Sequence, residues 1–166
     1  MLWAALHGYR MAAPAERASF WMLSAYSVTI GASRAINYGR EQSRPAPRLR
    51  ALARRAYRAA GVGGLRVHHF LPGIALAFTA GGAAILTRTD ARELWLSVPF
   101  GIGAGLTVDE IGLLLKADTP YWRSETAVLT QGAVAGLAAA ALAVGFQRRG
   151  AARQDDQDAG SGVAGP

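Results

Sequence analysis

Two pairs of adjacent ionisable residues attract attention because each pair lies in or beside a long apolar segment. His68 and His69 precede one such segment, and Asp109 and Glu110 lie inside another. Imidazole and carboxylate groups are ligands that Zn²⁺ accepts, and an ion with an open coordination position can activate water. Arg34, near the end of a third apolar segment, could attract a phosphate or pair with a carboxylate. Their shared chemistry depends on whether the chain brings these residues together.

Four apolar segments are each long enough to cross a bilayer, since a hydrocarbon core of about 30 Å needs roughly 20 helical residues. They cover residues 19–38, 68–87, 94–116 and 125–146. The chain is therefore predicted to be an all-α, polytopic membrane protein, with a bundle of four transmembrane helices in the domain 19–146. Residues 1–18 would form an interfacial or flexible segment. Residues 147–166 would form a disordered polar tail, because they include almost no bulky apolar residues.

Small residues support close packing of these helices. The chain of 166 residues is 51% hydrophobic and contains 20 glycines. Small residues recur at helical spacing as Gly73, Ala77 and Gly81, as Ser97, Gly101 and Gly105, and as Gly132 and Gly136. Such stripes let membrane helices approach one another closely. Asp109 continues the second stripe, so it is expected to extend from a groove of small residues, while Glu110 points about 100° away.

The charge of the chain is concentrated between the apolar segments. There are 18 basic and 11 acidic residues, a net charge of +7, and all the basic residues except Lys116 are arginines. The connector 39–67 carries eight of these arginines, and its pattern predicts a basic amphipathic helix that lies on an anionic leaflet. Arg54, Arg55 and Arg58 would contact lipid phosphates there. The positive-inside rule places the connector in the cytoplasm and both termini outside the cell membrane.

Composition also excludes several classes of site. The chain contains no cysteine, which rules out a disulfide framework, a thiolate metal site and a cysteine nucleophile. No basic module with interleaved aromatic residues is present, so nucleic acid is not an expected partner. Membrane lipids are the expected partner, together with a second copy of the chain or another membrane protein.

Antiparallel connectivity brings the polar residues of the four segments to one side. The end of the first segment, the start of the second, the end of the third and the start of the fourth would meet there. The residues concerned are Arg34, His68, His69, Asp109, Glu110, Tyr121 and Trp122. Tyr121 and Trp122 are expected at the membrane interface, where such side chains are enriched. A polar cluster near one membrane face is therefore predicted.

The order of these motifs resembles a known family. The pattern runs His68-His69-x-x-x-Gly73-Ile74, then Gly101-x-Gly103-x-x-Leu106-x-x-Asp109-Glu110, then Tyr121-Trp122. It is similar to the shared pattern of small polytopic bacterial integral membrane proteins of uncharacterised function. The resemblance implies a membrane fold and gives no activity.

Three functions fit this cluster. In the first, the protein is a structural or partner-binding bundle in which Arg34 and Asp109 form a buried pair. In the second, His68, His69 and Asp109 bind a divalent metal such as zinc, Glu110 is the general base, and Arg34 attracts the phosphate of a lipid-like substrate that is hydrolysed. In the third, Asp109 or Glu110 titrates within an ion or proton transporter subunit.

Overall fold

The computed structural model describes residues 1–42, 70–87, 90–114 and 122–161, and within them it is all-helical. Five helices are present in these ranges: α1 (Leu2–Met11), α2 (Pro14–Gln42), α4 (Phe70–Thr87), α5 (Asp90–Leu114) and α6 (Trp122–Ser161). The all-α fold class is thus confirmed. The predicted connector helix falls outside these residues from position 43 onward.

Two of the helices are long and apolar enough to cross a membrane. They are α4, over Phe70–Thr87, and α6, over Thr126–Asp156. Only 11% and 22% of their apolar windows are buried in the molecule, whereas the core helix of a soluble protein would be mostly buried. Among the described residues, α2 and α5 do not reach the same apolarity, and both carry several charged side chains.

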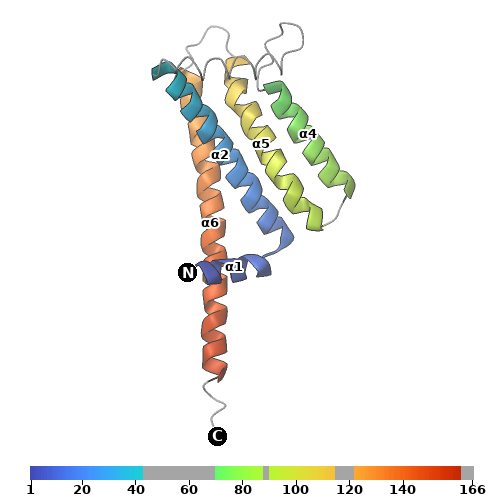
Figure 1. The fold of residues 1–166 in the computed structure, drawn as a ribbon, viewed down its shortest axis with the longest axis vertical. Helices are drawn as coiled ribbons and strands as arrows, with labels where there is room; N and C mark the ends of the chain where they lie inside the picture. Colours follow the sequence, from blue (N-terminus) through green and yellow to red (C-terminus); the bar gives the residue numbers. More distant parts are fainter. Residues whose placement is uncertain (43–69, 88–89, 115–121, 162–166) are drawn as a thin grey trace, which may run out of the picture.

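The four long helices lie in a row. Figure 1 shows α6, α2, α5 and α4 side by side, while the short helix α1 lies across α6. The two central helices, α2 and α5, run parallel, and each runs antiparallel to its outer neighbour. The extensive contacts join α6 to α2, α2 to α5, and α5 to α4. The described long helices therefore form a row, and the predicted bundle of four transmembrane spans is not confirmed. In this row, α2 and α5 each have a long helix on both sides.

Alternate glycines explain how α5 packs against two neighbours. A Cβ atom at Gly101 would overlap the carbonyl oxygen of Met22 in α2. A Cβ atom at Gly103 would instead lie 2.6 Å from the carbonyl oxygen of Gly73 in α4. Gly105 returns to α2, where its Cβ would lie 3.0 Å from the Cβ of Thr29. The predicted face of small residues is confirmed, because α2 approaches α5 closely at Gly101 and Gly105. Gly103, which lies between them in the sequence, allows the same close approach of α4.

The N-terminal region is helical and begins the first long helix earlier than expected. Ala12 is extended and separates α1 from α2. Pro14 opens α2, where a missing N–H costs nothing and a fixed φ suits the first turn. Glu16, two residues later, accepts a hydrogen bond from the backbone N–H of Ala13 at 3.2 Å, so it caps the helix start. Helix α2 thus starts at Pro14 rather than at residue 19.

The C-terminal prediction also needs correction. Helix α6 continues to Ser161, so the expectation of a disordered tail is wrong for residues 147–161. This stretch is poor in bulky apolar residues but rich in alanine, arginine and glutamine, which favour a helix. It is also held from outside, because α1 crosses it at Gly150. The low apolar content of residues 147–161 gave no reason to predict burial, but these residues still have the propensity to form a helix.

Candidate functional site

A buried ion pair joins α2 to α5. The Nε atom of Arg34 lies 2.6 Å from Oδ1 of Asp109, and the two side chains are only 4% and 6% exposed. Nη2 of Arg34 also donates to the backbone carbonyl of Asp109 at 3.2 Å. The hydroxyl of Ser33 donates to the other carboxylate oxygen, Oδ2. Asp109 is therefore held by two consecutive residues of α2, and the ion pair with Arg34 is the one that the structural hypothesis describes.

The neighbouring carboxylate is directed to a different helix. Oε2 of Glu110 accepts a hydrogen bond from the backbone N–H of Phe70 at 2.7 Å, and Glu110 is 9% exposed. Phe70 is the first residue of α4, where backbone N–H groups lack partners within the helix and the helix dipole favours a negative charge. Consecutive residues of α5 therefore link α2 and α4. We call Ser33, Arg34, Phe70, Asp109 and Glu110 the polar junction.

Apolar contacts lie one helical turn below the ion pair. Ile30 is 1% exposed and precedes Arg34 by four residues, so both lie on the same side of α2. A Cβ atom at Gly132 of α6 would lie 3.1 Å from Cγ2 of Ile30, which shows how closely α6 approaches. The contact between α2 and α6 at Ile30 thus excludes water from the side of the junction that faces the start of α2. An Arg–carboxylate pair in such surroundings is strongly coupled, because each charge lacks water as an alternative partner.

The other predicted site residues cannot be placed in this way. His68, His69, Arg54, Arg55, Arg58 and Tyr121 lie outside the described residues, and Trp122 opens α6 with a side chain that is also outside them. Within residues 1–42, 70–87, 90–114 and 122–161, no group of three or more His, Cys, Asp or Glu residues could hold a metal ion. The metal hypothesis therefore depends on the two histidines. The structure brings together Arg34, Asp109 and Glu110.

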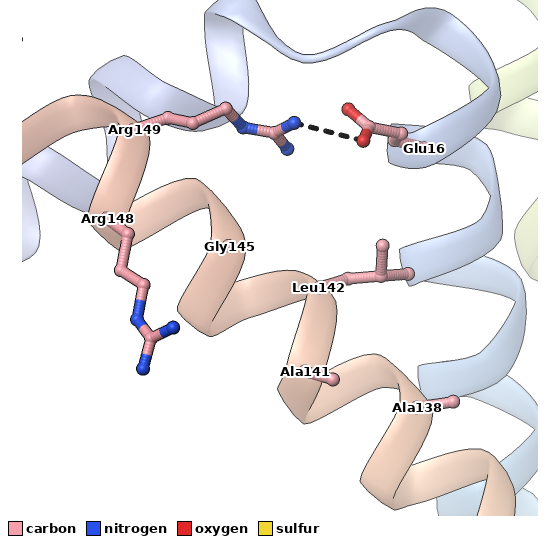
Figure 2. A pocket seen from close by; sticks show the side chains of 7 residues that line it. All are labelled: Glu16, Ala138, Ala141, Leu142, Gly145, Arg148 and Arg149. Carbon is pink, nitrogen blue, oxygen red and sulfur yellow. Dashed lines mark hydrogen bonds and ion pairs between the residues drawn. The ribbon is translucent and has the colours of Figure 1, made fainter.

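A second ion pair, not predicted from the sequence, joins α6 to the start of α2, far along that helix from the polar junction. Nη1 of Arg149 is 3.0 Å from Oε1 of Glu16, and these side chains are 47% and 36% exposed, respectively. Figure 2 shows the two side chains extending toward each other from α6 and α2. The hydrogen bond from Arg149 lowers the pKa of Glu16, and partial desolvation opposes that shift. The pair was missed because 133 residues separate its members and residue 149 was assigned to a disordered tail.

Helix α1 packs against α6 beside this ion pair, and the backbones of the two helices approach closely. A Cβ atom at Gly8 would overlap the carbonyl of Phe146, and one at Gly150 would overlap the carbonyl of Ala4. The ring of Phe146, only 3% exposed, packs edge-on against Tyr9 at a centroid distance of 5.6 Å. We call Ala4, Gly8, Phe146 and Gly150 the α1–α6 crossing. A glycine in each helix allows the two backbones to touch.

Comparison with known proteins adds no family to this description. No family model matches the chain, and no curated protein or solved structure matches it. A functional proposal therefore rests on the polar junction, the helix arrangement and the surface.

Proposed function

We propose that the chain is a four-span integral membrane protein that acts as a structural or partner-binding scaffold, with the polar junction as its internal link. The spans would be residues 19–38, 68–87, 94–116 and 125–146, as the sequence predicts. The observation that carries the proposal is the buried pair of Arg34 and Asp109. Both carboxylate oxygens of Asp109 have partners on α2, and Glu110 caps α4. Groups engaged in this way hold helices together.

The surface of the row supports a lipid environment. Helix α4 packs mainly against α5 and exposes large apolar side chains: Leu71 at 64%, Phe78 at 77%, Ile85 at 74% and Leu86 at 85%. Extended apolar surface of this kind is rare on soluble monomers. The charged residues Arg34 and Asp109 are compatible with α2 and α5 crossing a membrane. Arg34 and Asp109 face each other rather than the surroundings, which is how charged residues are accommodated within bilayers.

Cysteine labelling tests the four spans directly, because the chain contains no cysteine. Single cysteines would replace Ala46, Thr89, Ala117 and Gln154, and intact vesicles would be treated with a membrane-impermeant maleimide. We expect A46C and A117C to label from one side, and T89C and Q154C from the other. Labelling of A46C and Q154C from the same side would contradict four spans.

A double-mutant cycle tests the structural role of the junction. The variants are Arg34→Met, Asp109→Leu and the double replacement, each unfolded thermally in detergent. We expect each single change to destabilise the protein more than the double change, because a single change leaves a buried charge without its partner. Simple additivity would count against an internal link. About one equivalent of zinc in the wild type, lost in Asp109→Asn, would favour the metal-dependent hydrolase instead.

A further inference from the structure

A groove runs along α6 beside the first turn of α2. Its volume is about 690 Å³, and it is lined by Ala138, Ala141, Leu142, Gly145, Arg148, Arg149 and Glu16. The alanines, the leucine and the glycine belong to the predicted fourth span, and the arginines follow directly after it. Figure 2 shows these residues on successive turns of α6. The apolar part of the groove therefore ends at cationic side chains, at the point in α6 where the predicted fourth span ends.

Gly145 keeps this groove open. A Cβ atom at Gly145 would meet nothing within 4 Å, whereas one at Gly132 would lie 3.1 Å from Ile30 and one at Gly150 would overlap Ala4. The glycines at 132 and 150 are thus explained by helix packing, but Gly145 is not. Glycine also disfavours a helix interior. Its presence leaves room along α6 at the point where the apolar part of the groove meets the arginines.

The two arginines at the end of the groove differ in their partners. Arg149 is bound to Glu16, but Arg148 extends away from that ion pair (Figure 2). Arg148 is exposed, and in the part of the chain that the structure describes it has no acidic partner. Its guanidinium is therefore available to an anionic ligand. Planar guanidinium groups bind phosphate oxygens through two parallel hydrogen bonds.

We propose that this groove binds one anionic phospholipid, with its phosphate at Arg148 and an acyl chain along Ala138, Ala141, Leu142 and Gly145. The inference rests on the proposed membrane function, since the groove must face lipid. Charge complementarity at Arg148 selects an anionic headgroup, and the small side chains of α6 leave space for a narrow apolar chain. The cationic end lies where a headgroup would lie, just beyond the last apolar turn.

Native mass spectrometry of the full chain tests this site. The detergent-purified protein is mixed with equal amounts of phosphatidylglycerol and phosphatidylcholine that carry identical acyl chains. We expect one phosphatidylglycerol to be retained in preference to phosphatidylcholine. Arg148→Gln should lower that preference by about fivefold, the contribution of one arginine near a membrane surface. Arg153→Gln removes the same charge from the same helix outside the groove lining, and should leave the preference unchanged.

A second variant tests the apolar part of the groove. Gly145→Leu should fill this part and reduce retention of both lipids, because both share the acyl chain. Gly31→Leu is the matched control, since a Cβ atom at Gly31 also meets nothing within 4 Å and Gly31 does not line the groove. Circular dichroism should show unchanged helix content in both variants. Lipid retention that Gly145→Leu leaves at the wild-type level would overturn the proposal.

Other outcomes would overturn it as well. Equal retention of the two lipids, or equal losses in Arg148→Gln and Arg153→Gln, would mean that general surface charge and not this groove selects the lipid. A lipid-free dimer that dissociates in Gly145→Leu would assign the groove to a second copy of the chain. Cysteine labelling keeps the two proposals separate. Correct labelling without lipid preference overturns only the groove, whereas incorrect labelling overturns the membrane topology.

Discussion

The polar junction and the α1–α6 region each contain an arginine paired with a carboxylate, but in opposite surroundings. The pair Arg34–Asp109 is 4% and 6% exposed, while Arg149 and Glu16 are 47% and 36% exposed. The N–O distances, 2.6 and 3.0 Å, differ little by comparison. Burial, rather than contact distance, should therefore decide how much each pair matters. Water can replace a lost partner at the exposed pair, but not at the buried one.

The two regions also join helices by different means. At the junction, side chains of consecutive residues in α5 reach two neighbouring helices. At the α1–α6 crossing, the backbones touch at Gly8 and Gly150, and the ion pair lies on the surface beside them. Removing charge should therefore be severe at the junction, and adding volume should be severe at the crossing.

The largest expected effect comes from breaking the buried pair. Arg34→Met leaves Asp109 charged and unpaired in apolar surroundings, and we expect a loss of about 3–5 kcal/mol in the free energy of unfolding. Arg149→Met, the matched change in the exposed pair, should alter stability much less. Both are measured by thermal unfolding in detergent, followed by circular dichroism. Similar losses in the two variants would contradict the role given to burial.

The second effect comes from volume at the crossing. In Gly8→Ala the new methyl group would overlap the carbonyl of Phe146, so α1 must move away from α6, at a cost of about 1–3 kcal/mol. Trypsin cleavage after Arg10 should become faster as α1 separates. Gly31→Ala is the control, because its methyl group meets open space and alanine favours the helix by up to about 1 kcal/mol. Unchanged cleavage in Gly8→Ala would show that the crossing does not retain α1.

A third, smaller effect is expected where the junction caps α4. Glu110→Gln keeps an oxygen that can accept the N–H of Phe70 but removes the negative charge at the helix N-terminus, so we expect a loss of about 1 kcal/mol. Amide hydrogen exchange in the first turn of α4 should accelerate. Asp156→Asn removes an exposed charge from α6 and serves as the control. Acceleration spread evenly over α4, α5 and α6 would indicate a general loss of stability instead.

Much of the junction could be predicted from residue spacing. Periodicity placed Asp109 on a face of small residues and Glu110 on a different face, and the structure directs them to α2 and α4, respectively. Antiparallel connectivity placed Arg34 on the same side. The row itself could not be predicted, because apolar segments show that helices pack without showing which ones are neighbours. The double role of the glycines at 101, 103 and 105 follows only once both neighbours of α5 are known.

The α1–α6 crossing could not be predicted because its signals are weak and far apart. Its two glycines are 142 positions apart in the chain, and neither belongs to a predicted span. The stretch after residue 146 lacks bulky apolar residues, so hydropathy gave no reason to expect a tertiary contact there. Pro14 and Glu16 were the available local signal, because together they mark a helix start. That signal locates α2, but it does not identify Arg149 as a partner.

The smallest expected effect concerns the exposed pair, and its pH dependence gives a sharper test than its size. Arg149 lowers the pKa of Glu16 below its ordinary value of 4.5, so the charged carboxylate is favoured in the folded state. The stabilising contribution is therefore complete above that value and is lost as the pH falls through the lowered pKa. The melting temperatures of wild type and Glu16→Gln should differ slightly near neutral pH and converge in acid.

The difference should also shrink as salt rises to about 1 M, where screening acts over about 3 Å. A difference that persists at low pH would mean that Glu16 acts through packing and not through its charge. In that case electrostatic interaction would not explain the difference in stability contribution between the two ion pairs.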